Sequence, residues 1–392
     1  MRVTVVSYGS EGDVRPVLAL GIGLIGSGHE VVLVSDARRA EDAEEHGFEF
    51  YALDTGLLDR TLDSLDPGIA LRNFTGWPYA EWLQTSVLAA AGSDLVIGLP
   101  PISYAAAAAA DQVGAVGVLA GLQPLLPTRA FPPSALGAPR MPHWLNRPVG
   151  QLIDAVAWAG LSRGLNRARS GLPPSSNPYH SLPYLGGWSP ALVPTPEDWD
   201  SSRVMVTGHW SLPRAEGFVP PEEILAFLDA GDRPIYVGFG SMRGAKVTYA
   251  VEQALKAYAT DYRILLASPW PGELPDNVLR IGPTPHDWLF PKCGALVHHC
   301  GAGTAHAAAG SGIPSIPVPF GFDQPFWADR LYRLGVASKP VDPRSGWEAY
   351  EKPLRATVAA REPASDLAVR VNAEDGVAAA VSTLELLATK RP

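Results

Sequence analysis

The sequence predicts an α/β protein with two doubly wound domains, each built on a parallel sheet. Two observations support this fold class. Short apolar runs alternate with helical stretches along the chain, which is typical of parallel strands joined by crossover helices. The chain also has 392 residues, more than one ordinary hydrophobic core accommodates. Its composition, with 46% apolar and 18% charged residues, provides enough apolar side chains to bury two cores.

The first half begins with a predicted buried strand at Val3–Ser7, followed by a turn at Tyr8–Asp13. We expect the next helix to begin near Pro16, because proline is tolerated in a first helical turn, where its missing N–H costs nothing. Further strands are predicted at Val31–Ser35, Asp94–Leu99 and Val116–Ala120, and an Ala-rich helix is predicted at Tyr104–Gln112.

Two proline-rich stretches interrupt this alternation. Residues 122–148 contain proline every few positions, which regular structure does not allow, and loops of this length are usually binding loops. The second stretch, from Val193 to Pro221, marks the expected domain boundary. We therefore predict an N-terminal domain at residues 1–205, a C-terminal domain at 206–375 and a final helix at 376–392.

After this boundary the alternation of strands and helices restarts. Strands are predicted at Ile235–Phe239, Arg263–Ala267, Val278–Ile281, Ala295–His299 and Ser315–Pro319. Helical stretches separate most of them, and helix-forming sequence continues from about Ala364 to the end of the chain. The two halves therefore read as two copies of one architecture.

The charge and cysteine content narrow the classes of partner and compartment. The net charge is −9 and the chain has no run of Lys or Arg, which argues against nucleic acid or an anionic membrane surface as the main partner. Two cysteines provide no disulfide framework. Because no apolar stretch is long enough to span a membrane and the N-terminus lacks a signal peptide, we expect a cytoplasmic protein. Nothing in the sequence indicates an oligomeric state.

One apparent nucleotide motif is predicted not to bind a nucleotide. Gly21–Gly26 matches the G-x-G-x-x-G pattern, whose glycines must lie at a strand-to-helix turn to reach a pyrophosphate. Here they lie inside the predicted helix, well beyond the end of the first strand. We expect them to be small packing residues.

A stronger candidate for phosphate binding follows the strand at Ala295–His299. His298 and His299 end this strand, and Cys300 and the small residues at Gly301–Thr304 open a helical run. Small residues at a helix start leave backbone N–H groups free, and the helix dipole adds partial positive charge. An anion site of this kind and a tight glycine turn with satisfied histidines explain these residues equally well.

Two other turns carry carboxylates at the expected carboxyl ends of strands, where open α/β sheets bind ligands. Asp13 lies three residues before Pro16, where it can cap the helix or act as a general base. Asp323 and Gln324 follow the strand at Ser315–Pro319. They can cap the next helix, or they can bind sugar hydroxyls, which need both donors and acceptors.

Together these segments resemble glycosyltransferase family 1, which has the two-domain GT-B fold, and within it the bacterial antibiotic glycosyltransferases and the sterol glucosyltransferases. The resemblance spans nearly the whole chain and lies in the order and spacing of its motifs. These motifs are Gly9–Pro16, Gln123-Pro124 with Thr128–Pro132, Gly238–Ser241, Pro285–Pro291, His298–Thr304 and Asp323–Phe326. The resemblance implies two Rossmann-like domains that face each other across a cleft, with the C-terminal helix packing back on the N-terminal domain.

The resemblance also implies a role for each matching residue. Asp13 matches the catalytic base of the antibiotic branch, and His299 matches the histidine that contacts the donor's phosphate. Asp323 and Gln324 match the pair that holds the donor sugar. The other donor-binding residues that the resemblance implies are Ser10, Gly12, Ser241, Asp287, Trp288, Gly301, Ala302, Gly303 and Thr304.

Three segments depart from the family pattern. Cys300 stands in a run that is commonly glycine- or serine-containing, and Ala305 follows Thr304 where a second threonine is frequent. Phe320-Gly321-Phe322 precedes Asp323, where sterol enzymes tend to have two phenylalanines and then glycine. The last departure bears on the acceptor rather than on the fold.

The reaction implied is an inverting transfer of a hexose from a nucleotide-diphosphate sugar to a hydroxyl of an apolar small molecule. Asp13 takes the hydroxyl proton, and the helix start after His299 stabilises the leaving diphosphate. Asp323 and Gln324 favour a fully hydroxylated hexose, so UDP-glucose is the expected donor and a dTDP-deoxysugar is the alternative. Expected acceptor contacts, each of which can also be an ordinary core residue, are Trp77, Tyr79, Phe131 and Trp144.

Neither a metal ion nor a resident cofactor is expected. His298 and His299 are adjacent on a strand and point to opposite faces, so they do not share one ion, and with Cys293 and Cys300 they match no common zinc spacing. Asp198-Trp199-Asp200 matches the Asp-x-Asp pattern of metal-dependent transferases. It lies in the proline-rich linker, and we interpret it as a surface segment.

Two other classes of protein are the rivals. A nicotinamide-dependent oxidoreductase would use Gly21–Gly26, but these residues lie inside the predicted helix and not at the strand-to-helix turn, where such a motif binds its cofactor. A sugar-nucleotide-binding protein without catalysis would be expected to lack an acid or a histidine at the first turn, where Asp13 is present.

Overall fold

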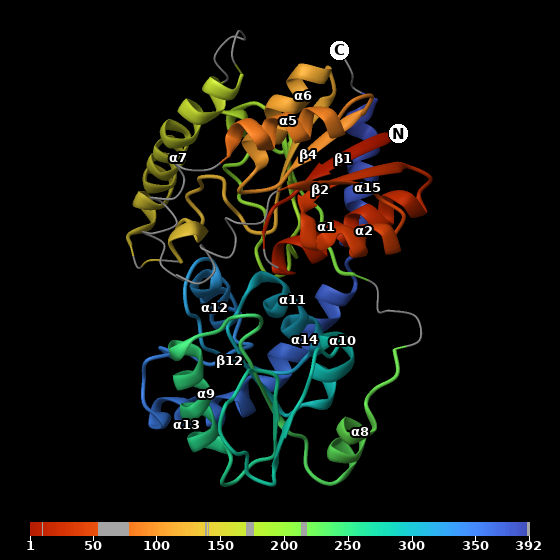
Figure 1. The fold of residues 1–392 in the computed structure, drawn as a ribbon. Helices are drawn as coiled ribbons and strands as arrows, with labels where there is room; N and C mark the ends of the chain where they lie inside the picture. Colours follow the sequence, from red (N-terminus) through yellow and green to blue (C-terminus); the bar gives the residue numbers. More distant parts are fainter. Residues whose placement is uncertain are drawn as a thin grey trace. The chain divides into compact units, whose positions relative to one another are not determined.

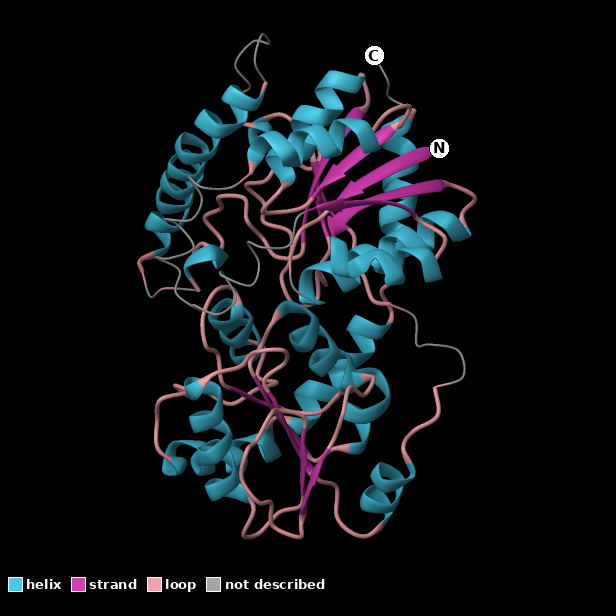
Figure 2. Cartoon of the chain, in the orientation of Figure 1, coloured by secondary structure: helices cyan, strands magenta, loops and turns pink. Residues whose placement is uncertain are grey.

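The structure, a computed structural model, describes residues 1–9, 11–53, 78–137, 139, 141–169, 176–212 and 218–389. The chain forms two compact units. Unit 1 comprises Met1–Pro190, Pro194–Leu212 and Asp375–Pro392, and unit 2 comprises Ala191–Val193 and Pro213–Glu374. Each unit has a parallel sheet with helices on both faces (Figures 1 and 2).

Among the described residues, the sheet of unit 1 has seven strands in the order β3-β2-β1-β4-β5-β6-β7, and all neighbours are parallel. These strands are β1 (Arg2–Val6), β2 (Glu30–Asp36), β3 (Glu49–Leu53), β4 (Leu95–Gly98), β5 (Val116–Gly121), β6 (Tyr184–Gly186) and β7 (Val204–Val206). The direction of winding reverses between β1 and β4. Open α/β sheets bind ligands at the carboxyl ends of the strands at such a switch point.

The helices of unit 1 are α1 (Glu11–Gly26), α2 (Ala40–Glu45), α5 (Tyr79–Ala89), α6 (Ser103–Val113), α7 (Asn146–Ala168) and α15 (Gly376–Ala388). In Figure 1, α15 lies beside α1, and the structure packs the two helices together. A Cβ added at Gly23 would overlap Val377 of α15, and one at Gly21 would lie 2.7 Å from the Phe48 ring. These two glycines therefore serve packing, and the predicted return of the last helix to the N-terminal unit is confirmed.

In the described part of unit 2, the sheet has five parallel strands in the order β10-β9-β8-β11-β12. They are β8 (Ile235–Gly238), β9 (Ile264–Leu266), β10 (Val278–Arg280), β11 (Ala295–His298) and β12 (Ser315–Pro317). The helices of unit 2 are α8 (Glu222–Asp229), α9 (Ala245–Tyr258), α10 (His286–Leu289), α11 (Ala302–Ser311), α12 (Gln324–Arg333), α13 (Trp347–Ala359) and α14 (Arg361–Asn372). The switch point of this sheet lies between β8 and β11.

Alternate residues of β8 enter two different cores, as the period of a strand requires. Val237 packs with Val251 and Tyr350 on the side of α9 and α13. Tyr236 packs with Leu289 and Phe290 on the other side. The strand is thus buried on both faces, and only its carboxyl end is available for a ligand. The prediction of two doubly wound parallel sheets is confirmed.

The start of α1 corrects one expectation. The helix begins at Glu11 rather than near Pro16, which lies inside it. Glu11 and Asp13 lie in its first turn, where negative side chains are stabilised by the positive end of the helix dipole. Of the helices described here, none has both the length and the apolar character needed to cross a membrane.

Candidate functional site

The turn between β1 and α1 places a carboxylate at the switch point of unit 1. Asp13 is the third residue of α1, so it lies in the first turn of the helix and not at the N-cap position itself. A Cβ at Gly9 would overlap the Asp13 carboxylate. Glycine at position 9 is therefore what allows this carboxylate to lie against the turn. Gly12 is exposed beside it, and Ser10 lies outside the described residues.

His298 is a structural residue at the end of β11. Its Nε2 lies 2.9 Å from Ser315 Oγ, and its Nδ1 accepts from the Cys300 N–H at 3.2 Å. Both ring nitrogens are thus used inside the protein. Burial lowers the pKa of His298 to about 3, so the ring is neutral at physiological pH.

His299 differs from its neighbour. Its Nδ1 is buried and has no hydrogen-bond partner. A Cβ at Gly240 would lie 2.9 Å from the His299 ring, and one at Gly301 would lie 2.7 Å from it, so two glycines make room for the imidazole. Burial, with a smaller effect of His286, lowers the pKa of His299 to about 4, although a backbone hydrogen bond with Gly238 acts in the opposite direction. A neutral imidazole with an unpaired nitrogen is expected to hydrogen-bond a ligand, because burying it unpaired is costly.

The helix that follows has an open N-terminus. Gly301 is the N-cap of α11, and no side chain caps the helix. No acidic residue lies in its first turn, and a Cβ at Gly303 would meet nothing within 4 Å. The first N–H groups of a helix have no partner within it. The start of α11 therefore has the features of an anion-binding site, beside the ring of His299.

Two non-glycine residues in the described chain have a positive φ angle, and both flank candidate site residues. Cys300, with φ 65°, follows His299, and Phe322, with φ 55°, precedes Asp323. Burial and then the charge of Asp323 raise the pKa of the Cys300 thiol. Residues held in this region of backbone conformation are concentrated at functional sites.

Asp323 and Gln324 lie at the start of α12 but have different environments. Asp323 occupies the N-cap position without a capping hydrogen bond from its side chain. Its Oδ2 accepts from Trp327 Nε1 at 2.9 Å. Gln324 is buried: its Oε1 accepts from the Phe320 N–H at 2.8 Å, and its Nε2 lies 3.5 Å from Met242 Sδ. The carboxylate remains half-buried at the turn, whereas the amide is used to hold the turn itself.

The remaining predicted donor contacts lie in the turn after β8 and in the short helix α10. Ser241 is exposed directly after Gly240, whose backbone borders the His299 ring. In α10, Asp287 is exposed, while the Trp288 ring lies 5.6 Å from the Phe218 ring and 4.9 Å from Lys292 Nζ. Unit 2 thus brings the Ser241 turn, His299 and the start of α11 together.

The proline-rich stretch after β5 forms a loop that is held in place by hydrogen bonds with Asp198 and Trp199. Thr128 Oγ1 donates to Asp198 Oδ1 at 2.6 Å, the Arg129 N–H donates to Asp198 Oδ2 at 3.0 Å, and Trp199 Nε1 donates to the Pro127 carbonyl at 3.2 Å. Our interpretation of the Asp-x-Asp segment as surface is therefore wrong for Asp198 and Trp199, because they hold this loop in place.

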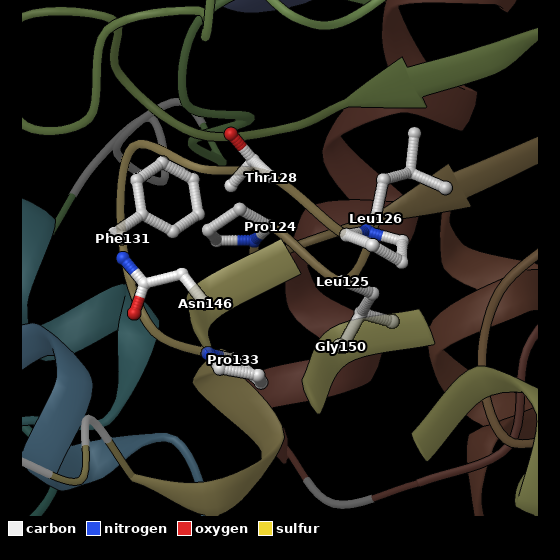
Figure 3. Close-up of a pocket in the computed structure, with 9 residues that line it drawn as sticks. Pro124, Leu125, Leu126, Thr128, Phe131, Pro133, Asn146 and Gly150 are labelled. Atoms are coloured by element: carbon white, nitrogen blue, oxygen red, sulfur yellow. The ribbon is translucent and has the colours of Figure 1, made fainter. Parts of the chain in front are cut away.

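Figure 3 shows a small cavity at this loop, bordered by Pro124, Phe131 and Asn146 among others. Its volume of about 10 Å³ accommodates about one water molecule. Phe131 and Tyr79 are buried, whereas Trp144 is 71% exposed, and Trp77 lies outside the described residues. The three described aromatics thus differ in exposure, and Phe131 borders this small cavity.

Comparison with known proteins establishes the family. Residues 3–84 match the glycosyltransferase family 28 N-terminal domain, and residues 264–376 match the erythromycin biosynthesis protein CIII-like C-terminal domain. The chain is 32% identical to O-mycaminosyltylonolide 6-deoxyallosyltransferase of Streptomyces fradiae over 425 residues, which cover 100% of this chain and 98% of that protein. The chain belongs to the family 1/28 glycosyltransferases.

This glycosyltransferase is also 31% identical to the sterol 3-beta-glucosyltransferase UGT80A2 of Arabidopsis thaliana over 385 residues. That match covers 87% of this chain and 58% of the plant protein, so the chain spans little more than half of that relative's length. The structure of the glycosyltransferase VinC in complex with dTDP matches with a TM-score of 0.69 and 18% identity, covering 100% of both chains. The predicted GT-B fold is confirmed.

Four residues of this glycosyltransferase shape the candidate site without having been assigned a role from the sequence. Gly9, Gly240 and His286 lie inside the motifs named above, whereas Trp327 lies outside them. His286 stacks on Phe290 with ring centroids 4.3 Å apart and helps to lower the pKa of His299. The sequence contained one usable signal: Trp327 lies four residues after Asp323, the spacing at which side chains meet on a helix. Among the described residues, no group of three or more His, Cys, Asp or Glu side chains is arranged to hold a metal ion.

Proposed function

We propose that this glycosyltransferase transfers a hexose from a nucleotide-diphosphate sugar to a hydroxyl group of an apolar small molecule, with inversion at the anomeric carbon. The observation that carries the proposal is the open start of α11 beside the unpartnered Nδ1 of His299. Backbone N–H groups and the helix dipole favour an anion there without a basic side chain. The donor's diphosphate has that chemistry.

In the proposed complex, the N–H groups of Ala302, Gly303 and Thr304 bind the diphosphate, and His299 and Ser241 add hydrogen bonds. Asp287 and Trp288 lie beside the nucleotide base. The open space over Gly303 supports this assignment, because a ligand can approach the backbone there. No metal ion is required in this proposal, because the helix start and the imidazole stabilise the diphosphate's charge.

Asp13 is proposed as the general base. It accepts the proton of the acceptor hydroxyl while that oxygen forms a bond to the anomeric carbon. The bond from the anomeric carbon to the diphosphate oxygen breaks, and the diphosphate leaves with the electron pair. The growing negative charge on the leaving group is stabilised at the start of α11. The position of Asp13 at the switch point of unit 1 supports this role.

UDP-glucose is the donor that we favour, since the Asp323 carboxylate accepts hydrogen bonds from sugar hydroxyls. Gln324 makes hydrogen bonds inside the turn, so the preference for a hexose rests mainly on Asp323. A dTDP-deoxysugar is the alternative, and the similarity to a 6-deoxyallosyltransferase favours it. For the acceptor, we propose a sterol-like or macrolide-like compound, the two kinds suggested by the names of the relatives.

The test is release of nucleotide diphosphate from UDP-glucose and from a dTDP-deoxysugar, each with a panel of apolar acceptors. We expect release with at least one acceptor, preference for the hexose donor by about tenfold, and loss of most of that preference in Asp323→Ala. A wild-type preference for the deoxysugar would move the protein to the alternative. Absence of transfer and of nucleotide binding with both donors would remove the proposed function altogether.

A further inference from the structure

Phe322 has a backbone conformation that a phenylalanine does not adopt without compensation. Its φ angle is 55°, and its side chain is 36% exposed. Left-handed backbone costs about 1–3 kcal/mol for a non-glycine residue and persists only where the surrounding structure imposes it. A single exposed apolar residue needs no explanation by itself. An exposed phenylalanine with a strained backbone does need one, because burial of its ring does not compensate for the strain.

The residues on both sides of Phe322 are fixed. Phe320 packs edge-to-face on Phe239, with ring centroids 5.3 Å apart, and its N–H donates to Gln324 Oε1 at 2.8 Å. The Gln324 N–H donates to the Gly321 carbonyl at 3.2 Å. These anchors account for how the turn keeps its conformation. They do not account for a large aromatic side chain at the position where glycine is favoured.

Phe322 is also the residue directly before Asp323, the proposed sugar-binding carboxylate. Trp327 Nε1 donates to Asp323 Oδ2 and fixes the orientation of that carboxylate. The amide of Gln324 is used inside the turn. The ring of Phe322, the residue next to Asp323, is then a further side chain that a sugar bound by Asp323 can meet.

Building on the proposed function, we propose that the ring of Phe322 packs against the C–H face of the donor's sugar and contributes to the choice of sugar. The face of an aromatic ring is negative in its quadrupole, so it attracts the weakly positive C–H groups of a pyranose. Asp323 binds hydroxyl groups at the edge of the same sugar. The strain at position 322 is then the cost of presenting the ring to this ligand.

The experiment measures the affinity that the sugar adds. Calorimetry gives the dissociation constants of UDP and UDP-glucose, and of dTDP and a dTDP-6-deoxyhexose, and the pair with the tighter-binding sugar nucleotide is used. The quantity compared is the dissociation constant of the nucleotide divided by that of its sugar nucleotide, which measures the affinity added by the sugar. In Phe322→Gly this ratio should fall about threefold to tenfold, the size of typical aromatic contacts. The affinity for the nucleotide alone should stay unchanged, and Phe322→Tyr should retain the wild-type ratio.

Thermal unfolding of Phe322→Gly separates this role from a packing role. Glycine relieves the positive φ angle, so we expect a melting temperature equal to or above that of the wild type. A clear decrease would identify the ring as a packing residue and overturn the proposal. Tyr332→Ala is the matched control, because Tyr332 is a 47% exposed aromatic on α12 and should change neither the ratio nor the melting temperature.

The outcomes also separate this inference from the proposed function. An unchanged ratio in Phe322→Gly, with normal nucleotide binding, overturns the role of Phe322 and leaves the proposed function standing. If wild-type protein binds neither UDP nor dTDP, the proposed function fails, and the inference fails with it.

Discussion

The two units use the same structural element, a helix that starts at the carboxyl end of a strand at the switch point, for opposite chemistry. In unit 1, the first turn of α1 carries Glu11 and Asp13. In unit 2, the first turn of α11 carries no acidic residue, and its N-cap is Gly301. The first helix satisfies its own positive end with carboxylates, whereas the second leaves that end available to an external anion.

This difference shows how one backbone arrangement provides two functions. A carboxylate in a first helical turn keeps its negative charge there, as a base near an acceptor hydroxyl must. A bare helix start beside a neutral imidazole whose Nδ1 has no partner attracts a diphosphate instead. Each of the following predictions changes either the carboxylates at the start of α1 or the anion-binding groups at the start of α11.

The largest effect is expected for Asp13→Asn, which removes the base from α1. Turnover should fall by about two to four orders of magnitude, the usual contribution of general-base catalysis. The affinity for nucleotide diphosphate should not change, because the substitution leaves α11 intact. The measurement is steady-state nucleotide release combined with calorimetric binding.

Glu11→Gln is the matched control for this prediction. Glu11 lies in the same turn, but it is exposed and pairs with Arg39, and exposed ion pairs contribute little. Turnover of this variant should stay close to that of the wild type. Near-normal turnover in Asp13→Asn would show that the carboxylate has no catalytic role.

An intermediate effect is expected when α11 is given the charge of α1. A side chain at Gly303 has space in the free protein, so Gly303→Asp should fold normally. The added carboxylate should repel the diphosphate and weaken nucleotide affinity by about ten- to a hundredfold. Gly303→Asn, which has the same shape without the charge, should lose much less. Equal losses in the two variants would mean that bulk, not charge, is what this helix start excludes.

The smallest effect is the pH dependence that His299 gives to nucleotide binding. Burial lowers the pKa of the free residue to about 4, and a bound diphosphate raises it, because the opposite charge favours the protonated ring. Binding therefore takes up a proton between these two pKa values, and affinity increases as the pH falls through that window.

The measurement is the dissociation constant of UDP in wild type and in His299→Gln from about pH 8 to about pH 5. The ionisation of UDP itself affects both proteins equally, so the difference between them isolates the histidine. The wild type should gain affinity, relative to the variant, by several-fold at the acid end. Parallel curves would place His299 away from the diphosphate.

Much of the fold could be predicted from the sequence, because strands buried on both faces are apolar runs that local patterns reveal. The missed elements lack that signal. β3 is only partly buried, and β6 and β7 have three residues each. The long helix α7 contains Gly150 and Gly164, which are poor helix formers. Both positions are packed closely against Pro127 and Tyr79, respectively, so tertiary packing rather than helix propensity determines this helix.

The candidate site was predictable only in part, for a related reason. The small residues after His299 identified the helix start, since that property is local. The partners of Asp323 and Gln324 could not be predicted, because their hydrogen bonds to Trp327 and Phe320 depend on how the turn before α12 folds. The space that Gly9 gives to Asp13 also appears only in three dimensions.

The most direct test of the central claim, that the start of α11 binds a nucleotide diphosphate without a metal ion, is a calorimetric titration in excess chelator. UDP and dTDP are titrated into wild-type protein and into Gly303→Asp. We expect one nucleotide bound per wild-type chain, with an affinity that magnesium or manganese does not change, and much weaker binding to the variant. Binding that disappears in chelator and returns with the cation would contradict this account.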